Sequence, residues 1–99
     1  MTNEAKRTLQ IISAAIKAGF KVSLFNGEYY SVKRSVTLAD FRDEVQATDE
    51  DLLILRDTVT DAIVGKVLLV YGNSVEELVC DYSGNPAMVQ FMKSIGESD

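Results

Sequence analysis

The sequence predicts an α+β domain spanning residues 1–99, built on a mainly antiparallel sheet of about five strands with helices packed on it. Apolar residues recur at helical spacing near both ends of the chain, and apolar runs of strand length fill the middle. Two turn signals, Asn26-Gly27 and Gly72-Asn73-Ser74, each separate a pair of these runs. The predicted order is α-β-β-α-β-β-β-α, in which helices cover a sheet of sequential hairpins.

The first helix is predicted to begin at Thr2 or Asn3, because either side chain can cap the first turn. It should end at Gly19, since glycine accepts the positive φ common just past a helix. The stripe expected to face the core consists of Ala5, Leu9, Ile12 and Ile16.

A hairpin is predicted next, with Lys21–Phe25 and Glu28–Arg34 as its strands and Asn26-Gly27 as a type I′ turn. The neighbouring Tyr29 and Tyr30 should place one aromatic ring on each side of the sheet. One of the two is therefore expected to be exposed, either as an anchor for a partner or as an ordinary residue on a wetted face.

The middle of the chain predicts a short second helix from Leu38 to Gln46, capped by Thr37, and then a buried strand over 52–56. The residues after that strand, 57–61, are predicted to form a loop. The buried stripe of the short helix should be Leu38, Phe41 and Val45.

The stretch Ile63–Tyr71 is apolar on both faces, which is typical of a strand in the middle of a sheet. Its predicted hairpin partner is the half-buried strand Val75–Tyr82. A last helix should start at Asn85-Pro86, because proline lacks the N–H group that the first turn leaves unbonded. It should end at Gly96, with a stripe of Met88, Phe91, Met92 and Ile95.

A single cysteine excludes an internal disulfide, and Cys80 alternates with apolar neighbours. We therefore expect Cys80 to be a small core residue, and the protein to work in a reducing, cytoplasmic setting. No apolar run approaches the roughly 20 residues that span a bilayer, so no membrane partner is expected.

The residue types favour a protein that is not an enzyme and needs no cofactor. Histidine is absent and cysteine occurs once, so a Cys/His zinc cluster is impossible. No glycine-rich phosphate loop occurs. Asp49-Glu50-Asp51 offers oxygen ligands for Mg²⁺ or Ca²⁺, but it lacks the spacing and glycine of a calcium loop. We expect no metal site.

Charge is unevenly distributed along the chain, whose net charge is −5. Residues 1–39 carry six Lys/Arg against two acids, whereas residues 40–61 carry eight acids against two Arg. Direct binding to nucleic acid is not expected of a chain with this balance. We call the eight acids the acidic tract: Asp40, Asp43, Glu44, Asp49, Glu50, Asp51, Asp57 and Asp61.

The acidic tract is the predicted partner-binding surface. Neighbouring side chains on a helix lie about 5–6 Å apart, close to the roughly 6–7 Å between phosphates along one nucleic-acid strand. Such a surface fits the basic groove of a nuclease or repressor, but it also suits a solvated face that keeps a small protein soluble. The residues predicted to contact the partner are Asp40, Asp43, Glu44, Asp49, Glu50 and Asp51, with Tyr29 or Tyr30 as an anchor.

The basic first third of the chain supports a different hypothesis, a small platform for single-stranded nucleic acid. Its members would be Lys6, Lys17, Lys21, Lys33 and Arg34 together with Tyr29 or Tyr30.

The stretch LVYGN at 69–73, followed by LVCDYS at 78–83, resembles small uncharacterised proteins of phages and mobile elements. In those proteins a strand ending in Val-Tyr-Gly-Asn precedes one ending in Asp-Tyr. The resemblance covers roughly residues 62–86 and implies a genomic context. The start of the chain, 3–34, is also similar in layout to some small acidic anti-CRISPR proteins.

Charge and resemblance together favour a non-enzymatic protein, encoded by a phage or mobile element, that binds and inhibits a host protein in the host cytoplasm. The expected partner is a defence nuclease such as a CRISPR effector, or another nucleic-acid-binding complex. The alternative is an accessory regulator or assembly protein that acts as a homodimer, because an uncovered sheet edge is a ready pairing surface.

Overall fold

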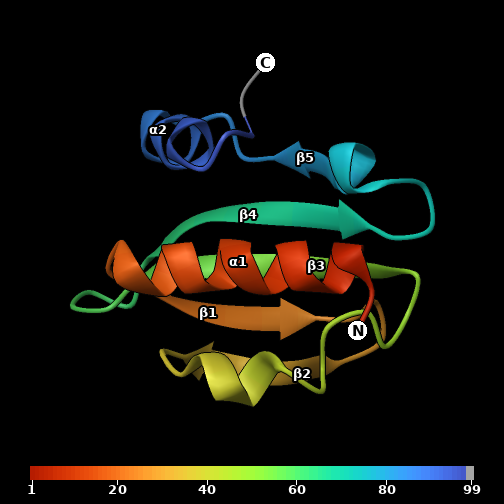
Figure 1. Ribbon diagram of the computed structural model, residues 1–99. Helices are drawn as coiled ribbons and strands as arrows, with labels where there is room; N and C mark the ends of the chain where they lie inside the picture. The colour runs from red at the N-terminus through yellow and green to blue at the C-terminus, as the bar shows by residue number, and fades with distance from the viewer. Residues whose placement is uncertain (98–99) are drawn as a thin grey trace.

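Both helices of the protein lie on one face of a five-stranded sheet, as the computed structural model shows (Figure 1). Neighbouring strands are antiparallel, in the order β2-β1-β3-β4-β5. The predicted α+β class is confirmed. The structure describes residues 1–97, whose elements are α1 (Asn3–Lys17), β1 (Phe20–Phe25), β2 (Tyr30–Ser35), η1 (Leu38–Phe41), β3 (Glu50–Asp57), β4 (Ile63–Val70), η2 (Val75–Glu77), β5 (Val79–Tyr82) and α2 (Pro86–Ser94).

Helix α1 begins and ends where the sequence predicts. The Thr2 hydroxyl accepts a hydrogen bond from the Ala5 N–H at 3.0 Å, and Gly19 follows the helix with φ of 96°. The buried stripe is rotated from the predicted one, so that Leu9 and Ile16 are only half-buried. The side chains that face the core are Ala5, Thr8, Ile11, Ile12 and Ala15.

The turn between β1 and β2 differs from the predicted type I′ turn. Asn26 is buried, and its side-chain oxygen accepts hydrogen bonds from the N–H groups of Glu28 and Tyr29 at 2.9 and 3.1 Å. Only Gly27 in this turn has a positive φ. An asparagine that bonds its own turn replaces the two left-handed residues that a type I′ turn requires. Both Tyr29 and Tyr30 are exposed, whereas the sequence predicted one.

The predicted short α-helix over 38–46 is instead the 3₁₀ turn η1 followed by further turns. Thr37 makes no side-chain capping bond, and Gln46 stops the segment with a positive φ of 58°. A segment this short gains little from helix propagation, so packing decides its shape. Phe41 and Val45 are buried against α1 and the sheet, as predicted.

The predicted pairing of 63–71 with 75–82 is confirmed as β4 and β5, but β3 and not β4 is the central strand. Strand β5 is also shorter than predicted, because Val75–Glu77 forms the 3₁₀ turn η2. The Ser74 hydroxyl starts that turn by accepting a hydrogen bond from the Glu77 N–H at 3.2 Å.

Cys80 is exposed, which corrects the prediction that it lies in the core. The reason is an irregularity in the pairing of β5 with β4. Leu68 pairs with Asp81 and Leu69 pairs with Val79, so Cys80 is the extra residue of a β-bulge. The bulge breaks the alternation on which the prediction rested.

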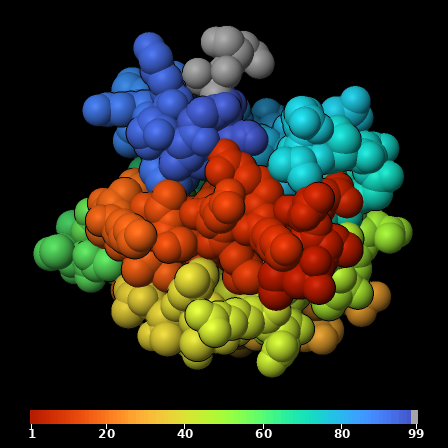
Figure 2. All heavy atoms as spheres, viewed as in Figure 1, coloured from red at the N-terminus to blue at the C-terminus, as the bar shows by residue number. Residues whose placement is uncertain are grey.

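The core lies between the sheet and the helices, and Figure 2 shows α1 crossing this face of the molecule between α2 and the 38–46 segment. Helix α2 packs against β4 at Gly65, where an added Cβ would lie 2.2 Å from Cγ of Met88. Phe91 packs edge-on against Phe20, with ring centroids 5.7 Å apart. In residues 1–97 the opposite face of the sheet carries no helix.

Candidate functional site: the helix-free face of the sheet

The strand register assembles a second surface on the side of the sheet away from the helices. Alternate residues of a strand point to opposite faces, and cross-strand partners share a face. Three rows of partners therefore cross this side from β1 to β4. The rows are Lys21–Arg56–Ile63, Ser23–Ile54–Lys66 and Phe25–Leu52–Leu68. We call the surface formed by these rows and by Tyr30, Lys33 and Arg34 of β2 the helix-free face.

The helix-free face is basic in an acidic protein. It carries five of the ten Lys/Arg residues of a chain whose net charge is −5. These five lie in and beside the first two rows, next to the aliphatic residues Leu52, Ile54 and Leu68 of the second and third rows. The basic residues are Lys21, Lys33, Arg34, Arg56 and Lys66, and the acids at the margins are Glu50, Asp61 and Asp81.

Two adjoining hollows shape this face. The first, of about 300 Å³, is lined by Ser23, Tyr30, Lys33, Arg34, Ile54 and Arg56. The second, of about 290 Å³, is lined by Leu52, Lys66, Leu68, Asp81, Tyr82 and Ser83. They adjoin because Ile54 of the first pairs with Lys66 of the second. Each hollow combines aliphatic surface with at least one cation.

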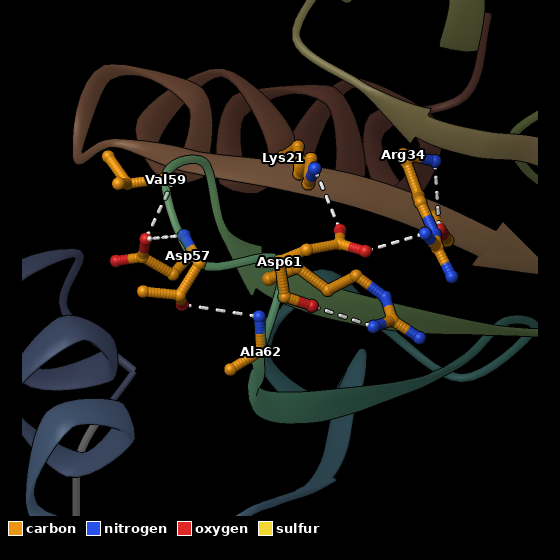
Figure 3. A network of polar contacts seen from close by, with 9 residues as sticks. Lys21, Arg34, Asp57, Val59, Asp61 and Ala62 are labelled. Carbon is orange, nitrogen blue, oxygen red and sulfur yellow. Dashed lines mark hydrogen bonds and ion pairs between the residues drawn. The ribbon is translucent and has the colours of Figure 1, made fainter.

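Three basic side chains converge on Asp61 at one end of the face (Figure 3). Its carboxylate contacts Lys21 Nζ at 2.7 Å and Arg34 Nη1 at 2.6 Å. Arg56 donates a hydrogen bond to the main-chain oxygen of Asp61 at 2.9 Å. The bond from Lys21, followed by the charges of Arg34 and Lys21, holds the pKa of Asp61 below its usual value despite partial desolvation.

The loop that presents Asp61 is held by Asp57. One carboxylate oxygen of Asp57 accepts hydrogen bonds from the N–H groups of Val59 and Thr60 at 2.8 and 2.9 Å. The Asp57 N–H donates to the carbonyl of Ala62 at 2.9 Å. The bonds from Thr60 and Val59 lower the pKa of Asp57.

Backbone strain coincides with this ion pair. Arg34 and Asp61 have φ of 50° and 64°, in the left-handed region that residues other than glycine seldom adopt. The Arg34 N–H donates to the Ser23 hydroxyl at 2.9 Å, which supports the left-handed residue from the neighbouring strand. Residues in such conformations cluster at binding sites.

The acidic tract does not form one surface. Asp40 and Asp43 are exposed and Glu44 is half-buried, all in the 38–46 segment beside α1. Asp49 and Glu50 are exposed at the start of β3. Asp57 and Asp61 lie at its other end, roughly 23 Å away at about 3.3 Å per strand residue.

Asp51, predicted to contact a partner from a surface loop, is fully buried in β3. One of its oxygens accepts hydrogen bonds from the Tyr71 hydroxyl at 2.6 Å and from the Gln46 N–H at 2.9 Å. The Tyr71 hydroxyl also lies 3.1 Å from the hydroxyl of Thr8. Burial raises the pKa of Asp51 in spite of these bonds. Its role is structural.

The other predicted residues divide between two faces. Tyr30 packs against Phe25 on the helix-free face, with ring centroids 5.0 Å apart, whereas Tyr29 lies in the preceding turn. Lys6 and Lys17 lie on the outer side of α1 and do not join the other bases. The predicted site does not include the two bases of the central strands, although their alternation with apolar residues along each strand indicates which face they share. These are Arg56 and Lys66.

Two further observations bear on ligands and membranes. Among residues 1–97, no three acidic or cysteine side chains gather closely enough to bind a metal ion. No helix in that range has both the length and the apolar character needed to cross a bilayer.

The site has to be interpreted from its own chemistry. Comparison of the chain with protein-family models, curated proteins and solved structures found no match. An α+β fold by itself specifies no activity, so the arrangement of side chains on the helix-free face has to carry the functional argument.

Proposed function

We propose that this chain is a non-enzymatic interaction protein that docks a protein partner on the helix-free face. The observation that carries the proposal is the register, which places aliphatic residues beside a cluster of five basic side chains on one surface. An apolar centre with a polar rim is the usual anatomy of a protein–protein interface. Tyrosine and arginine, both present here, are the commonest anchors in such interfaces.

The chemistry of the face favours a partner that carries carboxylates around an apolar side chain. Carboxylates would pair with the bases of the rim, and an aliphatic or aromatic side chain would fill the hollow over Ile54. A nucleic acid is less suitable, because its bases stack best on aromatic rings and the centre of this face is aliphatic. The net charge of −5 also repels a long polyanion.

The hydroxyl groups of the face support binding more than catalysis. The Ser23 hydroxyl accepts a hydrogen bond from the Arg34 N–H, and the Ser83 hydroxyl accepts one from the Lys66 N–H, both at 2.9 Å. Both oxygens therefore brace the backbone of strand residues. The sequence has no histidine to serve as a base for either of them.

The acidic tract is the second candidate docking surface, favoured by the exposure of Asp40, Asp43, Asp49 and Glu50. In that case the partner would present a basic groove, as expected of a host defence nuclease. Inhibition of such a nuclease stays a prediction that rests on the resemblance.

A capture experiment from bacterial lysate separates the two candidates. The face variant is Tyr30→Ser with Lys33→Glu and Lys66→Glu, all at exposed positions. The matched tract variant is Asp40→Lys with Asp43→Lys and Glu44→Lys. We expect a partner to be retained by the wild type and the tract variant and lost from the face variant, with melting curves confirming that all three fold.

The opposite pattern, with loss from the tract variant alone, would contradict the proposal and support the second candidate. If the retained partner is a nuclease, a cleavage assay with and without the chain tests whether docking inhibits it.

A further inference from the structure

Resting on the proposed function, we propose that Asp61 is a built-in competitor on the helix-free face. Its carboxylate occupies, from within the chain, the position on Lys21 and Arg34 that a carboxylate of the partner takes on docking. The partner class that follows is a polypeptide segment with Asp or Glu side chains next to an apolar anchor.

The geometry of Asp61 is that of a ligand. The cations around it come from three strands, with Lys21 on β1, Arg34 on β2 and Arg56 on β3, and Asp61 lies in the loop after β3. One carboxylate oxygen of Asp61 contacts Lys21 of β1, and the other contacts Arg34 of β2. Figure 3 shows the Lys21 and Arg34 side chains directed at this carboxylate.

The loop does not depend on the Asp61 carboxylate for its shape. The Asp57 carboxylate holds the N–H groups of Val59 and Thr60, and the Asp57 N–H is bonded to the Ala62 carbonyl. Arg56 contacts Asp61 through the main-chain oxygen. The carboxylate is therefore free to leave its cations while the loop keeps its conformation.

The Arg34–Asp61 ion pair is accessible to an incoming group, whereas the Asp61 oxygen on Lys21 is buried and the Lys21 side chain is 21% exposed. The side chains of Asp61 and Arg34 are 39% and 52% exposed. Ion pairs at such exposure are individually weak, since water and salt screen them. Arg34 also adjoins the hollow over Ile54, so a carboxylate that replaces Asp61 brings its neighbouring side chain to that hollow.

Competition from a tethered carboxylate adds selectivity. Because Asp61 is present at high effective concentration, a simple anion gains little by displacing it. A segment that also fills the aliphatic hollow gains a second, independent contribution to its binding free energy. The face should therefore discriminate against isolated carboxylates and in favour of acidic segments that contain an apolar residue.

The test uses three fluorescein-labelled probes: an alternating Glu-Leu peptide, a poly-Glu peptide of the same length and an oligo(dT). Fluorescence anisotropy is measured with the wild type, with Asp61→Asn and with the control Glu76→Gln, which removes one exposed acid on η2. Asparagine accepts the left-handed backbone of residue 61. We expect Asp61→Asn to bind the Glu-Leu peptide about threefold to tenfold more tightly than the wild type, and Glu76→Gln to bind it like the wild type.

We also expect poly-Glu to bind the wild type more weakly than the Glu-Leu peptide does, because poly-Glu has no apolar side chain to fill the hollow over Ile54. Unchanged or weaker binding of the Glu-Leu peptide by Asp61→Asn overturns the competitor role. If Glu76→Gln gains as much as Asp61→Asn, the effect is general electrostatics and the competitor role is again overturned.

The two proposals fail separately. If the face variant binds the Glu-Leu peptide as well as the wild type does, docking on the helix-free face is wrong. If the face variant loses binding but Asp61→Asn gains none, only the competitor inference is wrong. Tighter binding of oligo(dT) than of the Glu-Leu peptide would overturn a polypeptide as the partner class. The same conclusion would follow if neither peptide bound to the wild type or to Asp61→Asn.

Discussion

The acidic tract and the helix-free face relate sequence to surface in opposite ways. The tract is dense along the chain, with eight acids in residues 40–61, yet it is divided among the 38–46 segment, the two ends of β3 and the interior. The face draws on four strands between residues 21 and 68, yet forms one continuous surface. In a sheet protein, alternation and register assemble a surface, whereas density of charge along the chain does not.

The largest expected effect on stability is a difference between two acids of the tract, Asp49 and Asp51, which lie two residues apart. Asp51→Lys should lower the free energy of unfolding by about 3–5 kcal/mol, because it leaves a buried charge beside Tyr71 without a counterion. Asp49→Lys should change it by less than about 0.5 kcal/mol, since Asp49 is exposed. Urea unfolding measures both, and equal small effects would place Asp51 at the surface.

The burial of Asp51 could not be predicted from neighbouring residues. Its hydrogen-bond partners are the hydroxyl of Tyr71, 20 residues later, and the N–H of Gln46, a residue with a left-handed backbone. Three consecutive acids, 49–51, are typical of a solvated loop, which is what the sequence predicts for them. The pairing of β3 with β4, which brings Tyr71 to Asp51, decides otherwise.

The two faces of β4 provide the next comparison. Leu69 is fully buried under the helices and Leu68 is half-buried on the helix-free face. Leu69→Ala should cost about 2–5 kcal/mol of unfolding free energy, through lost burial and the cavity left behind. Leu68→Ala should cost about 1 kcal/mol. Equal costs in urea melts would mean that the second face is as well covered as the first.

The pH dependence of stability should distinguish the buried acid from the acid on the face. The folded protein raises the pKa of Asp51, so Asp51 adds stability at low pH that is lost as pH rises through its folded pKa. The folded protein lowers the pKa of Asp61, so that carboxylate adds stability above the ordinary Asp value, which is lost as pH falls toward its folded pKa.

Urea melts over a series of pH values check both signs. Asp51→Asn should remove a gain in stability that appears as the wild type is acidified from neutral pH. Asp61→Asn should remove part of the loss that appears below the ordinary Asp pKa of about 3.9. A wild-type profile that is unchanged by Asp51→Asn would contradict the assigned burial effect.

Local sequence signals were sufficient for most elements and insufficient for their arrangement. Both helices, the β1–β2 and β4–β5 pairs and the buried strand β3 follow from periodicity, capping residues and turn signals. The pairing of β1 with β3 does not, because it joins strands that are separated by the 38–46 segment. The bulge that exposes Cys80 also escapes any argument from strict alternation.

The candidate site was predictable only in part, for the same reason. The composition of the first third of the chain groups four residues of the site, Lys21, Lys33, Arg34 and Tyr30, as basic and aromatic residues. That they meet Arg56 and Lys66 depends on the β1–β3 and β3–β4 register. The pairing of Asp61 with Lys21 likewise requires that register.

The most direct test of the helix-free face as the docking surface is an NMR titration of the ¹⁵N-labelled chain with the alternating Glu-Leu peptide. If the peptide docks on the helix-free face, the shifted amide signals should cluster at Ser23, Ile54 and Lys66, which form one row across three strands. Docking there predicts no shifts at Asp40 or Asp43. Shifts confined to the 38–46 segment, with the row unchanged, would contradict docking on the helix-free face.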